Sequence, residues 1–174
     1  MQDLIKEITE EELEYYARQI VLSDINYDGQ IKIKRGKIAI IGLGGLGSPE
    51  AILLASMGLG YLKIVDKDKV AKPDLHRQIL YKRSDIGKKK VKVAEERLKE
   101  INPNLKVESI DTVLNEENVE EIIKDVDAVL DGLDNMFTRY IINRACIKLK
   151  KPYIFASAIE MFGNVSTIIP FETA

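Results

Sequence analysis

The spacing of hydrophobic residues changes repeatedly along the chain and predicts alternating helices and strands. Residues 37–41 are rich in isoleucine, as in a strand that is covered on both faces. Between residues 85 and 101, apolar residues recur every three or four positions, which indicates an amphipathic helix. A capping box at Thr9 predicts a helix that ends near residue 22, and residues 24–36 are polar and turn-rich. The same criteria predict further helices over residues 48–57, 116–124 and 137–149, and further strands over residues 61–65, 105–110, 126–130, 153–156 and 163–169.

This order of elements indicates an α/β fold with three layers. A mostly parallel sheet should lie between two layers of helices, with the final strands as antiparallel additions. The chain has 174 residues, of which 45% are hydrophobic, so it can bury a core without disulfides or a structural metal. We expect an N-terminal helical arm over residues 1–30 and a single α/β domain over residues 31–174.

The charge balance and cysteine content narrow the cellular setting. The 26 basic and 28 acidic residues nearly cancel, which argues against nucleic acid or a membrane surface as the partner. Two uncharged runs, residues 38–49 and 51–62, are interrupted by Glu50 and several glycines, so they do not form a membrane span. Cys146 is the single cysteine and is expected to be buried and inert. With no leader at the N-terminus, these features predict a cytoplasmic protein.

A glycine loop follows the predicted strand over residues 37–41 and opens the next helix. Glycines at 42, 44, 45 and 47 allow a tight turn and a close approach of the backbone to a phosphate at the helix N-terminus. Asp66 ends the next strand, where an acid commonly accepts hydrogen bonds from a ribose hydroxyl. The pattern predicts a Rossmann-like nucleotide-binding domain. It serves NAD, FAD, S-adenosylmethionine and ATP equally well, and the glycines also suit a purely structural turn.

Cations downstream of the loop favour a polyphosphate ligand. Arg77 and Gln78 follow a polar segment directly after Asp66. Lys90 lies at the start of a predicted helix, where the helix dipole does not favour a cation unless an anion is also present. A hydride-transfer site does not need these cations, whereas a triphosphate does. The neighbouring lysines at 82, 88, 89 and 92 are interpreted as a solvated basic face.

Carboxylates follow the predicted strand over residues 126–130. Open α/β folds hold their ligands at the carboxyl ends of the strands, which is where Asp134 should lie. A single carboxylate beside a triphosphate is sufficient to hold Mg²⁺. Simple capping of the following helix is the alternative interpretation at Asp131 and Asn135.

The ordered set of motifs resembles the ThiF/MoeB/HesA family, whose members activate ubiquitin-like or sulfur-carrier proteins. The resemblance covers most of the chain, and no single motif is specific by itself. The motifs are Tyr16-Ala17-Arg18-Gln19, Gly42 to Ser48, Asp66-Lys67-Asp68, Leu75-His76-Arg77-Gln78, Gly87 to Lys90, Ile101-Asn102-Pro103, Asp131 to Asn135 with Arg139 and Asn143, and Lys151-Pro152.

The resemblance implies a function and a role for each site residue. It implies ATP-dependent adenylation of the C-terminal carboxylate of a carrier protein ending in Gly-Gly. Asp66 would hold the ribose, Arg77 and Lys90 the phosphates, and Asp134 the magnesium ion. Arg18 resembles the arginine that reaches into the neighbouring subunit's site, which implies a homodimer. Further contacts with ATP are implied for Gly42, Gly44, Gly45, Gly47, Asp68, Gln78, Leu133 and Asn135.

Two departures from the family pattern affect these expectations. Pro73-Asp74 stands where the family usually has Ser-Asn, which places a carboxylate close to the expected phosphates. Longer family members continue into paired Cys-x-x-Cys zinc ligands and often a sulfur-handling cysteine, and this chain has neither. We therefore expect a truncated form without zinc, which carries out adenylation without a covalent thioester or persulfide step.

Two other functions stay open at this point. An NAD-dependent oxidoreductase would use the glycine loop and Asp66 equally well, but it leaves Arg77, Lys90 and Asp134 unexplained. A non-catalytic binding module of the same fold is the second alternative, and Asp74 and the missing cysteines favour it.

Overall fold

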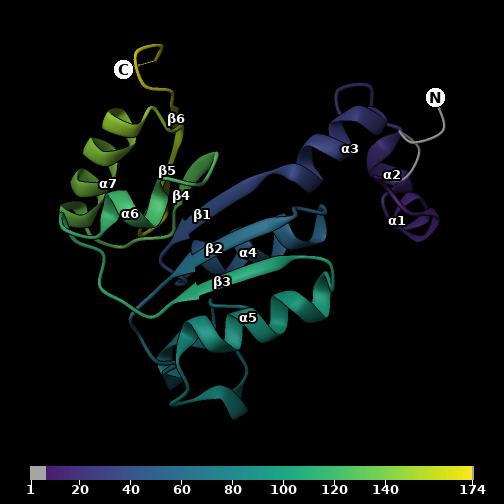
Figure 1. Cartoon of the computed structure of the whole chain (residues 1–174). Coiled ribbons are helices and arrows are strands. Elements are labelled where there is room, and N and C mark those ends of the chain that lie inside the picture. Colours follow the sequence, from purple (N-terminus) through teal and green to yellow (C-terminus); the bar gives the residue numbers. More distant parts are fainter. Residues whose placement is uncertain (1–6, 174) are drawn as a thin grey trace.

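A six-stranded sheet forms the middle layer of the protein in the computed structural model, which describes residues 7–173 (Figure 1). The strand order is β3-β2-β1-β4-β5-β6. The chain adds β2 and β3 on one side of β1 and then returns to add β4 on the other side. In an open α/β sheet, such a reversal leaves a crevice outside the carboxyl ends of the strands. The strands are β1 (Lys37–Ile41), β2 (Tyr61–Val65), β3 (Lys106–Ile110), β4 (Ala128–Asp131), β5 (Tyr153–Ile159) and β6 (Phe162–Ile168).

Helices cover both faces of the sheet, as predicted. Helices α4 (Gly47–Ser56) and α5 (Lys90–Ile101) pack on one face, and α6 (Val119–Ile123) and α7 (Met136–Leu149) on the other (Figure 1). Each face has its own hydrophobic core. Successive side chains of a strand point to opposite faces, so the buried isoleucines of β1 are shared between the two cores, Ile40 in one and Ile41 in the other. The predicted α/β three-layer fold is therefore confirmed.

The direction of the strands agrees with the prediction except at β5. Strands β1 to β4 pair in parallel, and β5 also runs parallel to β4. Only β6 is antiparallel, because it returns from β5 through a short turn. The expectation that the final strands are antiparallel additions is thus correct for β6 and wrong for β5.

The N-terminal helix begins where the sequence predicted and ends earlier. The capping box is present: the Thr9 hydroxyl accepts from the Glu12 amide at 3.1 Å, and the Glu12 carboxylate accepts from the Thr9 amide at 2.8 Å. The helix does not continue to residue 22, because the chain turns at Tyr16 and its ring packs against Gly58 beyond α4. The two resulting helices are α1 (Glu10–Tyr15) and α2 (Ala17–Ile20).

Residues 24–36, predicted to be turn-rich, instead contain helix α3 (Asn26–Arg35). The buried face of this helix carries Gln30, which is 1% exposed and donates to the Met57 carbonyl at 3.0 Å. Because this buried position is polar, the sequence of the helix lacks the regular spacing of apolar residues that indicates an amphipathic helix. Helix α3 also spans the predicted boundary between residues 30 and 31, so we propose that the arm joins the domain through this helix.

The segment between β2 and α5 is longer and more structured than predicted. It contains two 3-10 turns, η2 (Lys72–Asp74) and η3 (Arg83–Asp85), and a bridge between Lys69 and Lys89. Helix α5 starts at residue 90 rather than 85, because the buried Asp85 carboxylate accepts hydrogen bonds from the Lys82 amide and the Lys88 ammonium. Helix α6 is likewise shorter than predicted, since the Asn115 side chain accepts hydrogen bonds from two amides just before it.

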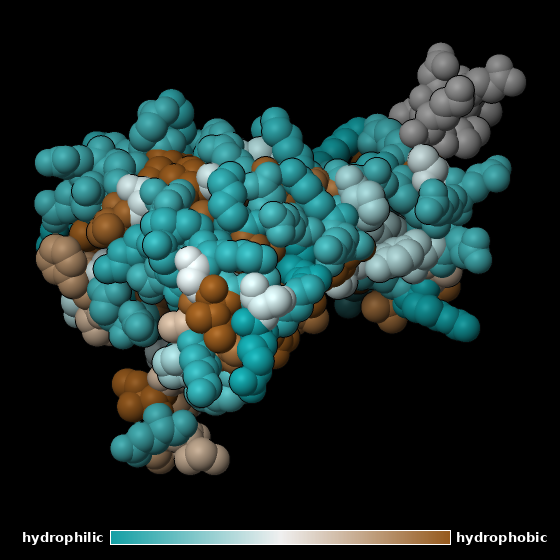
Figure 2. Space-filling model, turned by 90° about the horizontal axis from the view of Figure 1, so that it is seen from below, coloured by the Kyte–Doolittle hydropathy of each residue, from teal (hydrophilic) through white to brown (hydrophobic). Residues whose placement is uncertain are grey.

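The surface seen in Figure 2 is largely polar, and the cysteine is buried, as the sequence predicted. Within residues 7–173, no helix is long and apolar enough to cross a membrane. The face seen from below is mostly hydrophilic, with its hydrophobic atoms in small groups (Figure 2). Cys146 is 1% exposed, and burial raises the pKa of its thiol to about 12, so it carries no reactive thiolate near neutral pH.

Candidate functional site

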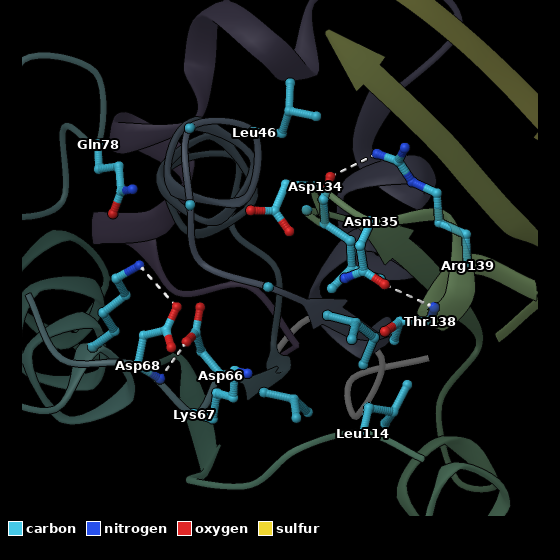
Figure 3. Close-up of a pocket in the computed structure, with 18 of the residues that line it drawn as sticks. Leu46, Asp66, Lys67, Asp68, Gln78, Leu114, Asp134, Asn135, Thr138 and Arg139 are labelled. Atoms are coloured by element: carbon cyan, nitrogen blue, oxygen red, sulfur yellow. Dashed lines mark hydrogen bonds and ion pairs between the residues drawn. The ribbon is translucent and has the colours of Figure 1, made fainter. Parts of the chain in front are cut away.

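A pocket of about 780 Å³ opens at the carboxyl ends of the parallel strands (Figure 3). This volume is typical of sites for small molecules and nucleotides. The β4 wall consists of residues 131–139, and the 66–90 wall lies opposite it. Most of the predicted site residues line the pocket: Gly42, Gly44, Gly45, Asp66, Asp68, Arg77, Gln78, Lys90, Leu133, Asp134 and Asn135.

The glycines of the loop have two different structural roles. Gly42 has φ +93°, and a Cβ there would come within 2.7 Å of the Gly132 carbonyl oxygen. A Cβ at Gly47 would overlap the Gly42 carbonyl oxygen, so both positions require glycine for the fold itself. At Gly44 and Gly45 an added Cβ would meet only ordinary contacts, at 3.6 Å or more. Both positions line the pocket, and without side chains they leave the backbone of the loop open to it.

Asp66 ties the glycine loop to the second strand. Its Oδ2 accepts a hydrogen bond from the Leu43 amide at 2.7 Å, and its Oδ1 accepts from the Asp68 amide at 2.7 Å. On the other side of the loop, the Leu43 carbonyl accepts from the Tyr81 hydroxyl at 3.0 Å. A carboxylate has about four lone-pair sites, so Asp66 retains acceptor capacity for a ribose hydroxyl.

Lys90 lies between two carboxylates on the 66–90 wall. Its side chain is 6% exposed, and its Nζ is 3.6 Å from Asp68 and 3.9 Å from Asp74. Both separations exceed the usual length of a charge-assisted hydrogen bond, about 2.7–2.9 Å. The ammonium is therefore buried beside the pocket, with hydrogen-bonding capacity still available for an anion.

Arg77 and Gln78 flank Asp74 on the same wall. The Arg77 side chain is 51% exposed, with Nη2 3.7 Å from Asp74 and Nη1 donating to the Pro73 carbonyl at 2.8 Å. Gln78 is 2% exposed, and its Nε2 donates to Asp74 Oδ1 at 3.0 Å. The carboxylate that the sequence placed near the expected phosphates is thus in contact with both predicted ligand residues.

The β4 wall is held by a buried ion pair. Arg139 Nε donates to Asp131 Oδ2 at 2.8 Å, and its Nη2 donates to the carbonyls of Leu133 and Ala156 at 2.6 and 2.7 Å. Asp131 is 0% exposed and also accepts from the Tyr153 hydroxyl at 2.7 Å. Asp131 is therefore not the cap of α7 but the partner of a buried arginine.

Asp134 and Asn135 lie at the exposed end of this wall. Asn135 caps α7, because its side chain accepts from the Thr138 amide at 2.9 Å. The Asp134 carboxylate points toward the open middle of the pocket and away from Arg139 (Figure 3). It makes no hydrogen bond or salt bridge with residues 7–173. Within the same range, no group of three or more acidic, histidine or cysteine side chains is placed to hold a metal ion.

Two buried side-chain oxygens have no hydrogen-bond partner within the described chain. One is Gln78 Oε1, in a side chain that lines the pocket. The other is Glu50 Oε2, on the first turn of α4. Burial raises the pKa of Glu50 to about 7, and the nearby charge of Asp131 adds to the effect.

Two predicted residues do not line the pocket, and several lining residues were not predicted. Gly47 packs beneath the loop, and Arg18 is exposed on α2, among the N-terminal helices at the far end of the sheet from α7 (Figure 1). Residues 112–114 line the pocket directly after β3. Their signal in the sequence was their position at the end of a parallel strand. Arg139 belonged to the family motifs, but only the fold reveals its pairing with Asp131.

The sequence is similar to those of a known family and of two named adenylyltransferases. The model of the ThiF family matches residues 16–174. The chain is 40% identical over 162 residues to the adenylyltransferase and sulfurtransferase MOCS3 of Culex quinquefasciatus, covering 93% of this chain and 37% of that protein. It is 39% identical over 158 residues to a sulfur carrier protein adenylyltransferase of Thermus thermophilus, covering 91% of this chain and 58% of that protein. The chain thus spans about a third to three fifths of these relatives.

Solved structures share the fold. PaaA has a TM-score of 0.79 and 30% identity, over 88% of this chain and 49% of the PaaA chain. The tRNA N6-threonylcarbamoyladenosine dehydratase TcdA of E. coli, in complex with ATP, also has a TM-score of 0.79. It is 26% identical to this chain, over 84% of this chain and 60% of the TcdA chain.

Proposed function

The chain belongs to the ThiF family, and on that premise we propose that it binds ATP and adenylates the C-terminal carboxylate of a ubiquitin-like or sulfur-carrier protein. The observation that carries the proposal is that Arg77, Lys90 and Asp134 line one pocket with the open part of the glycine loop. The names of the two relatives and the ATP complex of TcdA support this function. The NAD-dependent oxidoreductase is not favoured, because these three charged residues would have no role in hydride transfer.

The proposed reaction needs no nucleophile or base from the protein. An oxygen of the carrier carboxylate attacks the α-phosphorus of ATP and forms a new P–O bond. The bond between the α-phosphorus and the oxygen bridging to the β-phosphate breaks, and pyrophosphate leaves with that electron pair. Catalysis then consists of alignment and of neutralising charge on the phosphate oxygens. Arg77 and Lys90 would supply this charge, and Asp66 would accept a hydrogen bond from a ribose hydroxyl.

The donor set would fit a magnesium ion whose remaining ligands come from water and phosphate oxygens. Asp134 offers one exposed carboxylate that faces the pocket and has no partner in residues 7–173. Magnesium usually keeps several waters and binds through one or two carboxylates together with phosphate oxygens. When bound, the ion would neutralise charge on the triphosphate. Asp134 would hold it there, on a loop whose neighbouring carbonyl is fixed by Arg139.

We further propose a cytoplasmic homodimer in which Arg18 completes the partner's site. Arg18 is exposed and does not line the pocket of its own chain, which supports a role in trans. Mixing an Arg18→Ala chain with an Asp134→Ala chain should restore part of the activity, because some dimers would then contain one intact site. A mixture that stays as inactive as either variant would indicate a site built within one chain.

Isotope exchange between ATP and pyrophosphate tests the proposed activity. Exchange should appear on addition of a carrier protein that ends in Gly-Gly and should disappear when the two terminal glycines are removed. If ATP binds but no exchange occurs with any such carrier, the protein would be a non-catalytic binding module of the same fold. Preferential binding of NAD over ATP with Mg²⁺ would contradict the nucleotide assignment itself.

A further inference from the structure

We infer that Asp74 makes ATP binding at this site dependent on a divalent cation, an inference that rests on the function proposed above. The Asp74 side chain is 14% exposed and lines the pocket. Its carboxylate is 3.7 Å from Arg77 and 3.9 Å from Lys90. These are the two cations assigned to the phosphates, so a negative charge already lies beside both of them.

The Asp74 carboxylate is held in position by two hydrogen bonds. Its Oδ2 accepts from the Ala71 amide at 3.0 Å, within the short turn η2. Its Oδ1 accepts from Gln78 Nε2 at 3.0 Å, and Gln78 is itself 2% exposed. Swinging away from the pocket would leave a buried amide group without a partner, which costs about 1–3 kcal/mol. The negative charge therefore stays beside the cations when a ligand enters.

The charges of the pocket leave little attraction for an unneutralised polyphosphate. Arg139 is committed to the buried Asp131, so it contributes no net attraction. The other lining cations, Lys67, Arg77 and Lys90, are outnumbered by the lining carboxylates of Asp66, Asp68, Asp74 and Asp134.

A divalent cation changes this balance. ATP alone carries about four negative charges and its magnesium complex about two, because each divalent ion cancels two. The repulsion from Asp74 is thus roughly twice as large for ATP alone.

Gln78 allows the charge of Asp74 to be removed without losing hydrogen bonds. In the Asp74→Asn variant, the asparagine oxygen can accept from the Ala71 amide. Its amide nitrogen can donate to Gln78 once the Gln78 amide has rotated, and Gln78 Oε1, which now has no partner in the described chain, would then accept. The variant differs from the wild type mainly by one charge at a fixed position.

Calorimetric titration of the full chain with ATP tests the inference, once with excess Mg²⁺ and once with EDTA. Asp74→Asn should tighten binding of ATP in EDTA by about tenfold and binding with Mg²⁺ by about threefold or less. The ratio of the two dissociation constants should therefore fall. The matched control is Asp24→Asn, which removes one charge from an exposed loop outside the pocket and should keep the wild-type ratio.

Each other outcome of this titration has a definite meaning. Equal changes under both conditions, or no change, would overturn the inference while leaving the proposed function intact. Weaker binding with Mg²⁺ in Asp74→Asn would make Asp74 a ligand of the cation and would also overturn it. If the wild type binds ATP under neither condition, the proposed function fails together with the inference.

Discussion

On the β4 wall, Arg139 donates to Asp131 and to two backbone carbonyls at 2.6–2.8 Å, whereas on the 66–90 wall Lys90 lies 3.6 and 3.9 Å from its two carboxylates. Arg139 is buried, and its side-chain donors are engaged within the chain. On the second wall, Arg77 is half exposed and Gln78 Oε1 has no partner in the described residues. The cation of the β4 wall is thus engaged within the chain, whereas the cations of the 66–90 wall keep donors available.

The difference separates groups that build the pocket from groups that can bind in it. A buried ion pair whose remaining donors are satisfied gains nothing from a ligand and loses much when one partner is removed. A cation with long, partial contacts can exchange them for phosphate oxygens at little cost. The β4 wall therefore supports the fold and the position of Asp134, while the 66–90 wall carries the cations that we propose contact the phosphates.

Replacing Arg139 should have the largest effect, because it leaves a buried carboxylate without its cation. We expect Arg139→Met to lower the free energy of unfolding by about 3–5 kcal/mol, measured by denaturant titration. Tyr153→Phe is the control, since it removes only one hydrogen bond from the same carboxylate and should cost about 1.5–3 kcal/mol. A loss below about 1 kcal/mol in Arg139→Met would show that the β4 wall does not depend on the pair.

Replacing Arg77, which lines the same pocket, should separate activity from stability. Arg77→Ala should reduce ATP–pyrophosphate exchange by a factor of about 100, the effect typical of losing one preorganised transition-state contact. Its free energy of unfolding should stay within about 0.5 kcal/mol of the wild type, since the side chain is half exposed. Unfolding of this variant would contradict the division between the two walls.

Glu50 is affected by the charge of Asp131 on the β4 wall, but its own Oε2 has no hydrogen-bond partner in the described chain. Replacing Arg139 should change stability more than replacing Glu50. Its pKa is raised to about 7 from an ordinary 4.5, so the native state binds a proton that the unfolded chain releases. Stability must then decrease as pH rises from about 4.5 to about 7. Allowing for solvent screening of this partly exposed group, Glu50→Gln should gain about 1–2 kcal/mol at pH 8 and almost nothing at pH 4.

Denaturant titrations across this pH range would detect the effect of Glu50. Glu14→Gln, at an exposed position of α1, should follow the wild-type profile and serves as the matched control. A gain in Glu50→Gln that is the same at both pH values would mean that the charge of Glu50 is not the cause.

The strands before and after the glycine loop and its helix could be predicted from the sequence to the residue. The predicted ranges 37–41 and 61–65 are those of β1 and β2. Helix α3 could not be predicted, because its most buried residue is Gln30, whose partner Met57 is distant in the sequence. Its burial depends on a tertiary contact rather than on a local apolar period.

The site could be predicted as far as its motifs extend. Asp66, Arg77, Lys90, Asp134 and most of the glycine loop line one pocket, and each belongs to a motif that could be recognised in the sequence. The role of Asp131 could not be predicted, because an aspartate between a strand and a helix can either cap the helix or pair with a buried arginine, and the sequence is the same in both cases. Which cations are free and which are engaged depends on distances that only the folded chain defines.

The contact of Gly132 with Gly42 and Gly47 restricts how this pocket can change during evolution. A side chain on any of the three glycines would collide with the backbone of another, so these three positions tolerate no substitution and fix the loop after β1 against the loop after β4. Changes in ligand preference have to arise elsewhere. The 66–90 segment is free of this restriction, and a selection experiment for another nucleotide should collect its accepted mutations there.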